Sequence, residues 1–292
     1  MQVNGVEIVD TFAEAFPMRG ARVLVTALSR KWALEAARAA TGFATSVIAC
    51  GCEAGIEEET GDTPDGRPGV NMLFFAVSRE ELEKQLLQRI GQCIMTAPTT
   101  ACFNNLEASQ HIRVGGKLRY FGDGYQGSKL LGDRRFWRIP VMEGEFLLED
   151  SFGVQKAVGG GNILILAETL EVALEAAEKA VVAMKQVKGI ILPFPGGIVR
   201  SGSKVGSRYR FLPASTNTAY CPTLRGRVES ELPPGVNAVL EIVVDGLELE
   251  AVKEAMRVGL LAACLPGVKS ISAGNYGGSL GPYHLHLREL LG

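Results

Sequence analysis

The chain has 292 residues, 47% of them hydrophobic, which is enough apolar material for two domains or one large one. A formal net charge of −2 excludes the broadly basic surface of a nucleic-acid-binding protein. The acidic N-terminus does not resemble a signal peptide, and no run of about 18 apolar residues predicts a membrane span. Six cysteines without a secretion signal indicate reduced thiols, so we expect a cytoplasmic protein.

The first half of the chain contains two strand–helix units. The apolar run at residues 21–26 precedes a predicted helix around residues 31–40 and a second predicted strand at residues 45–50. Residues 69–77 form another strand-like run, and a capping box, Ser78 to Glu81, opens the helix after it. That helix places Leu82, Leu86 and Ile90 on one face.

The second half repeats this order. The run at 162–167 precedes a helix around 172–181 and a strand at 189–194, and the sequence ALEAA occurs in the first helix of both halves. The strand-like run 235–243 then precedes a helix that ends near Pro266-Gly267. The apolar stripe of that helix consists of Leu249, Val252, Met256 and Leu260. Each half therefore predicts the split β-α-β arrangement of ferredoxin-like folds.

Between the halves, residues 117–121, 136–141 and 144–149 have the composition of three short antiparallel strands joined by Gly/Asp turns. The predicted fold is α+β: two duplicated ferredoxin-like lobes with β-rich insertions. We predict an N-terminal lobe at residues 1–150, which includes the antiparallel insertion, and a C-terminal lobe at residues 151–292.

Two glycine-rich segments resemble nucleotide-binding loops without meeting their requirements. Glycines 122, 124 and 127 match G-x-G-x-x-G, but turn residues and β-formers follow instead of the helix that holds a pyrophosphate. Residues 197–204, GIVRSGSK, resemble a phosphate-binding loop, yet Lys204 is displaced and no amphipathic helix follows. We reject a nucleotide site at both segments.

The second of these segments retains a set of cations in a Gly/Ser-rich loop: Arg200, Lys204, Arg208 and Arg210, with Ser203 beside Lys204. Such a loop suits a small molecule with several negative charges. A solvated basic hairpin explains the same residues equally well.

Glu241 lies inside AVLEIVV, an otherwise apolar strand run. An ionised carboxylate is costly there unless it is paired, and its pKa tends to rise. Glu241 is therefore a candidate for proton transfer. The alternative is that Glu241, Val239 and Val243 share an open face of the sheet and meet water.

The remaining polar candidates are weaker. Asp150 and Ser151 end the insertion strands and Asn162 follows three glycines, so these residues have turn chemistry that would equally suit a cleft. Cys50 with Cys52 and His284 with His286 are paired too closely for a typical zinc site, which favours core thiols and a terminal strand. No metal site is predicted.

Twelve blocks of residues occur in an order that resembles formylmethanofuran:tetrahydromethanopterin formyltransferase. They are DTFAEAF, ATGFATSVI, EAGIE, TPDGRPGV, IGQCIMTAPTT, FGDGYQ, EGEF, PFPGGIV, SGSKVG, FLPASTN, EAMRVG and ISAGNYGG. The resemblance covers nearly the whole chain. It implies two ferredoxin-like lobes, a homotetramer, and reversible formyl transfer between methanofuran and tetrahydromethanopterin without a metal or prosthetic group.

The resemblance also implies roles for particular residues. The catalytic glutamate proposed for the family lies in an apolar strand before the last long helix, and by that context it corresponds to Glu241. Methanofuran carries a glutamate-rich tail and tetrahydromethanopterin carries phosphate and carboxylates. The basic loop is therefore expected to bind anionic coenzyme tails, with Asp150, Ser151 and Asn162 as further candidates for substrate contact.

The charge of −2 departs from the strongly acidic archaeal members of this family, and the segments SVIACG and RELLG resemble the bacterial members. Those act in formaldehyde oxidation with a methanofuran analogue and assemble with hydrolase subunits that release formate, so such subunits are candidate partners. A different reading of the same lobes is a non-catalytic ligand-binding or scaffold subunit of a one-carbon enzyme complex. A carboxyl group inside an apolar strand argues against that reading, because a scaffold has no use for it.

Overall fold

The computed structural model describes residues 1–292 and divides them into two compact units. The middle unit is Met18–Ala157, and the terminal unit combines Met1–Pro17 with Val158–Gly292. The second boundary lies seven residues beyond the predicted 150/151 boundary, and the first 17 residues join the C-terminal part of the chain. No helix combines the length and apolar character needed to cross a lipid bilayer.

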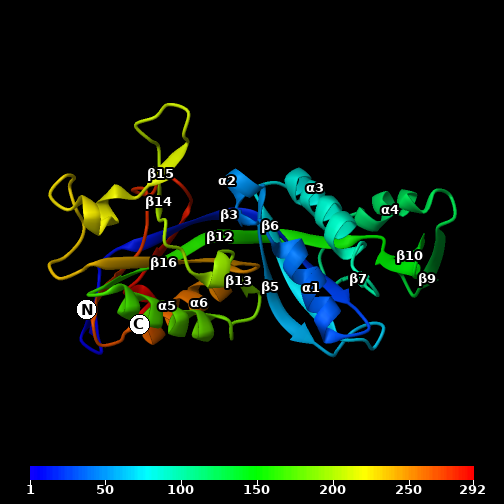
Figure 1. The fold of residues 1–292 in the computed structure, drawn as a ribbon, viewed down its shortest axis with the longest axis horizontal. Coiled ribbons are helices and arrows are strands. Elements are labelled where there is room, and N and C mark those ends of the chain that lie inside the picture. The colour runs from blue at the N-terminus through cyan, green and yellow to red at the C-terminus, as the bar shows by residue number, and fades with distance from the viewer. The chain divides into compact units, whose positions relative to one another are not determined.

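The middle unit has the predicted β-α-β-β-α-β order. Its elements are β3 (Phe12–Thr26, which begins in the terminal unit), α1 (Arg30–Thr41), β5 (Cys52–Thr60), β6 (Gly69–Ala76), α3 (Arg79–Arg89) and β7 (Ala101–Asn104). The strands pair antiparallel in the order β5-β6-β3-β7. Ala33 of α1 and Leu82 of α3 belong to the same buried core as Met72 of β6, so both helices cover one face of this sheet (Figure 1).

The terminal unit repeats this arrangement. Its elements are β12 (Phe152–Ala167, which begins in the middle unit), α5 (Leu170–Met184), β13 (Ile190–Ile191), β16 (Ala238–Gly246), α6 (Leu249–Ala263) and β17 (Val268–Ser272). The strands pair antiparallel in the order β13-β16-β12-β17. Both sheets therefore have the strand order of a ferredoxin-like fold, and the duplicated α+β architecture is confirmed.

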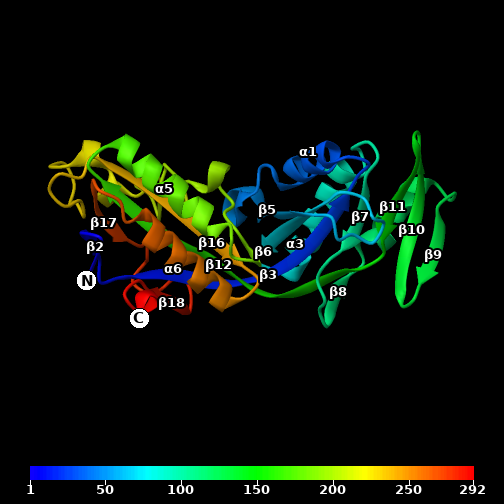
Figure 2. The same ribbon diagram turned by 90° about the horizontal axis from the view of Figure 1, so that it is seen from below.

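The predicted helices are present, but the capping box before α3 is only half formed. Ser78 Oγ accepts a hydrogen bond from the backbone N–H of Glu81 at 3.1 Å, although the Glu81 carboxylate turns to Lys84 and Gln85 and does not reach back. The predicted stripes of α3 and α6 are buried except for Leu249, which is half-buried. α5 and α6 lie side by side along the sheet of the terminal unit (Figures 1 and 2).

Two predicted strands are wrong. Residues 45–50 form only the short strand β4 (Thr45–Ser46) and the helix α2 (Val47–Cys50), because Ser46 caps the turn and Gly51 adopts the left-handed conformation. The true second strand, β5, begins after that glycine. Residues 117–121 lie in α4 (Val114–Leu118) and a 3₁₀ turn (Arg119–Gly122), because burial of Val114 and Leu118 follows helical spacing.

The antiparallel insertion of the middle unit is nevertheless present. Its strands are β9 (Gly127–Leu131), β10 (Arg134–Val141) and β11 (Gly144–Glu149), and they lie side by side in Figure 2. β9 begins at Gly127, the last glycine of the G-x-G-x-x-G segment, so no helix stands where a pyrophosphate would bind. The unit also contains β8 (Gln110–Ile112) and a π-helix (Ile90–Ile94).

The terminal unit carries additions around its sheet. β1 (Gln2–Val3) and β2 (Val6–Ile8) extend the edge at β17, and β18 (Tyr283–His286) pairs with the first residues of β3. Four short 3₁₀ turns occur at Pro195–Gly197, Thr218–Tyr220, Pro222–Leu224 and Glu289–Leu291. A hairpin of β14 (Ser203–Val205) and β15 (Ala214–Thr216) projects away from β12 and β16 (Figure 1).

Candidate active site

Glu241 lies near the middle of β16, where the side chains alternate between two environments. Leu240 and Ile242 are buried against the helices, whereas Glu241, Val239 and Val243 are half-buried on the opposite face. Glu241 is opposite Leu164 of β12, which in turn is opposite Ser272 of β17. These three residues therefore form a row across the sheet, with strands about 4.8 Å apart.

This face of the sheet is not open. The long segment between β13 and β16 folds over it, and Leu232 and Val236 of that segment pack with Leu164 and Leu166 of β12 in a small separate core. Tyr220 and Val239 border the same core. Of the two environments considered for Glu241, the structure therefore gives a partly enclosed one.

Burial raises the pKa of the Glu241 carboxyl from 4.5 to about 7. The side chain keeps some exposure to solvent, so the group is accessible as well as perturbed. A carboxyl group that titrates near neutrality can both take and return a proton at physiological pH. Glutamates with strongly raised pKa values occur mainly at functional sites, so this property marks Glu241 as a candidate catalytic residue.

The chain next to Glu241 leads directly to a second set of polar groups. Val199 exchanges backbone hydrogen bonds with Glu241, at 2.9 Å and 2.7 Å, as an isolated bridge beyond the two residues of β13 that pair with β16. Four residues later, the carbonyl oxygen of Ser203 accepts a hydrogen bond from the Tyr276 hydroxyl at 3.1 Å. The pKa of Tyr276 is raised by burial and by the charges of Glu241 and Glu14, and the Ser203 hydrogen bond opposes this.

A polar cavity of about 320 Å³ lies in the terminal unit beside Ser203 and Tyr276. Lys204, Glu231 and several hydroxyl and amide groups line it. The complete lining is Thr11, Ser203, Lys204, Asn217, Tyr220, Glu231, Ala273, Gly274, Asn275 and Tyr276. Glu241 does not line the cavity, but its charge acts on Tyr276, which does. The arrangement offers a proton-transfer group beside a pocket of hydrogen-bonding groups.

Asn162 and Glu14 hold the loop that supplies Asn275 and Tyr276. The Asn162 amide accepts a hydrogen bond from Gly274 N–H and donates one to Gly274 C=O, at 2.6 Å and 3.1 Å. The buried Glu14 carboxylate accepts hydrogen bonds from four backbone N–H groups of the same loop. Asn162, predicted as a substrate contact, thus has its amide group engaged with the protein backbone.

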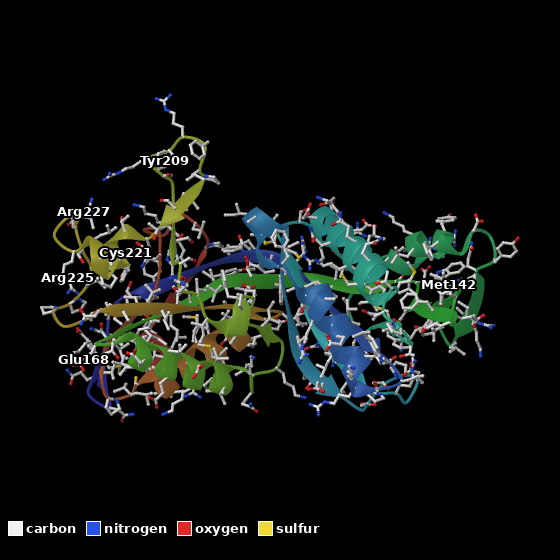
Figure 3. The ribbon with its side chains drawn as sticks, in the orientation of Figure 1. Met142, Glu168, Tyr209, Cys221, Arg225 and Arg227 are labelled. Carbon is white, nitrogen blue, oxygen red and sulfur yellow. The ribbon has the colours of Figure 1, made fainter.

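The cations of the basic loop separate in the structure. Lys204 is half-buried at the cavity, and its ammonium group donates to Thr218 Oγ1 at 3.0 Å. Arg200, Arg208 and Arg210 are exposed. Arg208 and Arg210 flank Tyr209 at the tip of the projecting hairpin (Figure 3). The predicted cluster therefore does not converge on one ligand site within this unit.

Asp150 and Ser151 belong to the middle unit, and their side chains serve its structure. The Asp150 carboxylate accepts hydrogen bonds from Trp137 Nε1 at 2.7 Å, Ser151 Oγ at 2.9 Å and Arg113 Nε at 3.1 Å. Burial tends to raise the pKa of Asp150, but these donors outweigh it and the pKa is lowered. Substrate contact by Asp150 and Ser151 stays a prediction, and the bonds around them explain both residues without a ligand.

The cysteine and histidine pairs are also accounted for by packing. Cys52 is buried and its pKa is raised to about 11, which makes its thiol a poor nucleophile. The rings of His284 and His286 lie against Phe12, with centroids 4.6 Å and 5.2 Å away. The prediction of core thiols holds for Cys52 but not for Cys50, which is half-buried, and His284 and His286 lie on the strand β18 as predicted.

A larger cavity of about 830 Å³ lies in the middle unit and is mainly apolar. Its lining includes Met95, just after the π-helix, and Met142, which is labelled in Figure 3. Its one carboxylate, Glu143, accepts a hydrogen bond from Thr99 N–H at 2.6 Å. Volume alone would favour this cavity, but its lining is mainly apolar and its carboxylate is bonded to a backbone N–H. We therefore regard the polar cavity beside Glu241, whose pKa is raised to about 7, as the better candidate.

Sequence reasoning missed Glu14, Tyr220, Asn275 and Tyr276. A signal existed for Glu14, because it interrupts the apolar run around Phe12 and Phe16 just as Glu241 interrupts its own strand. Asn275 and Tyr276 stand in a glycine-rich segment with no periodicity. Nothing local links that segment to Glu14, because more than 260 residues separate the partners.

The family profile described as "Formylmethanofuran-tetrahydromethanopterin formyltransferase" matches residues 1–141, and "FTR, proximal lobe" matches residues 144–290. Formylmethanofuran–tetrahydromethanopterin formyltransferase of Methylococcus capsulatus is 58% identical over 297 residues, covering 100% of both chains. The structure also resembles the Methanosarcina barkeri formyltransferase, with a TM-score of 0.94, 52% identity and 100% coverage of both chains. It resembles a chain of the Methylorubrum extorquens formyltransferase/hydrolase complex with methylofuran, with a TM-score of 0.97, 54% identity and coverage of 100% and 99%.

The raised pKa of Glu241 predicts a pH-dependent stability. The folded protein holds this proton more tightly than the unfolded chain, so ionisation of Glu241 lowers the free energy of unfolding as pH rises from about 5 to 8. The shift from 4.5 to about 7 sets an upper bound of about 3 kcal/mol, which partial exposure reduces. Glu241→Gln should flatten this pH dependence in urea unfolding curves. Glu178→Gln, on the exposed face of α5, should leave it unchanged.

Proposed function

This chain belongs to the formylmethanofuran–tetrahydromethanopterin formyltransferase family, and on that premise we propose that it transfers a formyl group reversibly between N-formylmethanofuran and tetrahydromethanopterin. Both coenzymes are substrates in this proposal, and neither is a resident cofactor. Family membership rests on matches over the full chain. The observation in the structure that best supports the chemistry is a carboxyl group with a pKa of about 7 beside a polar cavity.

The reaction needs one group that acts as general base and then as general acid. The attacking amine adds to the formyl carbon, a tetrahedral intermediate with an oxyanion forms, and the departing nitrogen must gain a proton. We assign proton transfer to Glu241, which takes the proton of the attacking nitrogen and returns one to the leaving nitrogen. A ternary complex holds both substrates close together and in the right orientation, which supplies the rest of the rate acceleration. No covalent enzyme intermediate is therefore needed.

The polar cavity is a suitable place for part of one coenzyme. Lys204 offers a positive charge, and Tyr220, Asn217 and Asn275 offer hydrogen-bonding groups at its wall. Amide, hydroxyl and ammonium groups of this kind fix the orientation of a polar substrate, while contacts elsewhere supply affinity. We therefore propose that Lys204, and not the arginines of the hairpin tip, contacts an anionic group of the bound coenzyme.

A purely structural role for the chain is less favoured. Relatives that cover its whole length are named as formyltransferases. In addition, a scaffold would gain nothing from Glu241, because a half-buried carboxyl in an apolar strand costs stability whenever it ionises.

Substitution of Glu241 tests the activity and its mechanism together. Wild-type protein should exchange the formyl group between formyl-tetrahydromethanopterin and methanofuran, and Glu241→Gln should fold normally yet lose about 10²–10⁴-fold in turnover. The limb of the wild-type pH–rate profile near pH 7 should disappear in the variant. Near-native turnover of Glu241→Gln would remove Glu241 from the mechanism, and an inactive wild type would contradict the proposed function.

Lys204 and Arg210 form a matched pair for testing the cavity. Lys204→Ala should raise KM for the natural coenzymes about tenfold with little change in kcat, because a contact made equally in ground and transition states affects mainly binding. Arg210→Ala removes one positive charge from the hairpin tip and should leave both constants unchanged. Equal effects of the two substitutions would show that general charge, not the cavity, attracts the substrate.

We further propose that the protein forms a homotetramer and associates with hydrolase-type subunits. Support for the association with hydrolase-type subunits comes from a 55% identical relative in Methylorubrum extorquens, which is named as one subunit of a formyltransferase/hydrolase complex. The homotetramer is proposed from the family resemblance alone. Mass photometry of the purified chain should give a mass about four times 31.2 kDa. A monomer at micromolar concentration would contradict the tetramer, and failure to co-purify hydrolase subunits from its native cell extract would contradict the larger complex.

A further inference from the structure

We propose that Glu14 is a positioning residue, whose buried carboxylate fixes the loop 274–281 so that Asn275 and Tyr276 face the polar cavity. The proposal rests on the function proposed above, because it assigns that cavity to substrate binding. Glu14 itself does not line the cavity and does not contact a reacting group. It acts on the site only through the backbone of the loop.

The contacts of Glu14 are unusual in number and in kind. The residue is 1% exposed, on the first part of β3. Its Oε2 atom accepts hydrogen bonds from the N–H groups of Tyr276 at 2.8 Å and Gly278 at 3.1 Å. Its Oε1 atom accepts hydrogen bonds from Gly281 at 2.8 Å and from Leu280. One side chain thus satisfies four backbone donors of a loop without secondary structure.

The charge of the carboxylate is essential to this arrangement. Burial tends to raise its pKa, but the four N–H groups outweigh burial, and the pKa of Glu14 is lowered. An ionised carboxylate has acceptor sites for all four donors, whereas an amide group of the same shape presents two N–H donors of its own to the loop. Glutamine at this position would therefore repel one pair of the loop N–H groups.

Apart from Glu14, few groups outside the loop fix its conformation. Gly277 and Gly278 both adopt left-handed conformations, with φ of 66° and 79°, which confers freedom when a restraint is lost. Asn275 Nδ2 donates to Thr11 Oγ1 and Phe12 C=O, and Asn162 holds Gly274, but these bonds lie at one end of the loop. Within the loop, Gly277 N–H donates to Asn275 Oδ1 and Ser279 Oγ donates to Tyr276 C=O, but these bonds are local. Apart from the bond of the Tyr276 hydroxyl to Ser203, Glu14 is the main link from residues 276–281 to the rest of the unit.

A fixed loop matters because it presents side chains to the cavity. The Tyr276 hydroxyl reaches Ser203 C=O only when its backbone is held in place, and this hydrogen bond joins the loop to the segment that carries Lys204. Displacement of the loop by about 1 Å would misalign the polar groups that orient a substrate. We therefore infer an effect of Glu14 on substrate affinity, and not merely on folding.

The test compares Glu14→Gln with Glu7→Gln, which alters an exposed glutamate on β2. In Glu14→Gln, backbone amides of residues 276–281 should exchange hydrogen at least about tenfold faster, measured by mass spectrometry of peptides from this loop. KM for the coenzymes should rise about tenfold, with kcat falling less than about threefold. Glu7→Gln should resemble wild type in all three measurements.

A merely structural role predicts a different pattern. It would reduce the fraction of folded enzyme, lowering apparent kcat at unchanged KM. Accelerated exchange of the loop with wild-type KM would therefore overturn the proposal, as would unchanged exchange. If wild-type protein itself lacks formyl transfer, the proposed function fails, while the exchange measurement still decides whether Glu14 holds the loop.

A second variant keeps the proposal testable if Glu14→Gln does not fold. Gly278→Ala disturbs the loop while leaving Glu14 intact, because the new Cβ would lie 3.0 Å from His284 Cε1. Gly277→Ala has a similar backbone strain but meets no atom within 4 Å, and it serves as the matched control. Gly278→Ala should raise KM more than Gly277→Ala. Equal KM values for these two variants would overturn the link between loop position and substrate binding.

Discussion

The candidate site of the terminal unit depends on how the protein offsets the cost of desolvating a buried carboxylate. Glu14 and Glu241 both interrupt apolar strands, and each carries the desolvation cost of an anion in that setting. For Glu14 the cost is offset by four backbone donors, and the group stays charged and static. For Glu241 burial prevails, and the group titrates near neutrality. Two glutamates in similar strands thus obtain opposite properties from the donors around them.

This difference explains how one unit contains both a fixed loop, held by Glu14, and a carboxyl group that exchanges protons, that of Glu241. An ionised carboxylate with four fixed donors has no reason to exchange protons, so it suits the support of a loop. A carboxyl that is poorly compensated gains or loses its proton readily, so it suits catalysis. The terminal unit brings both glutamates close enough to Tyr276 for their charges to raise the pKa of its hydroxyl.

The features that follow from the periodicity of apolar residues could be predicted from the sequence. Alternation and helical spacing predicted the two β-α-β-β-α-β units, and the lone charge in AVLEIVV singled out Glu241. It failed at residues 45–50 and 117–121, where a cap and a helical contact override local β-type composition. It also failed to separate Lys204 from Arg208 and Arg210, because spacing along a loop does not tell which cations turn inward. The partners of Glu14 could not be found locally, since tertiary folding alone joins them.

The terminal unit is built from both ends of the chain, and this has a consequence for its biosynthesis. The middle unit, Met18–Ala157, is complete in sequence well before translation ends, so it can fold while the ribosome is still working. Residues 1–17 must wait for their partners. The loop 274–281 and β18, which engage Glu14 and the start of β3, follow the middle unit in the chain and are synthesised after it. The candidate site therefore forms only after the middle unit has been synthesised, and a chain interrupted before residue 274 would carry a folded middle unit without an assembled site.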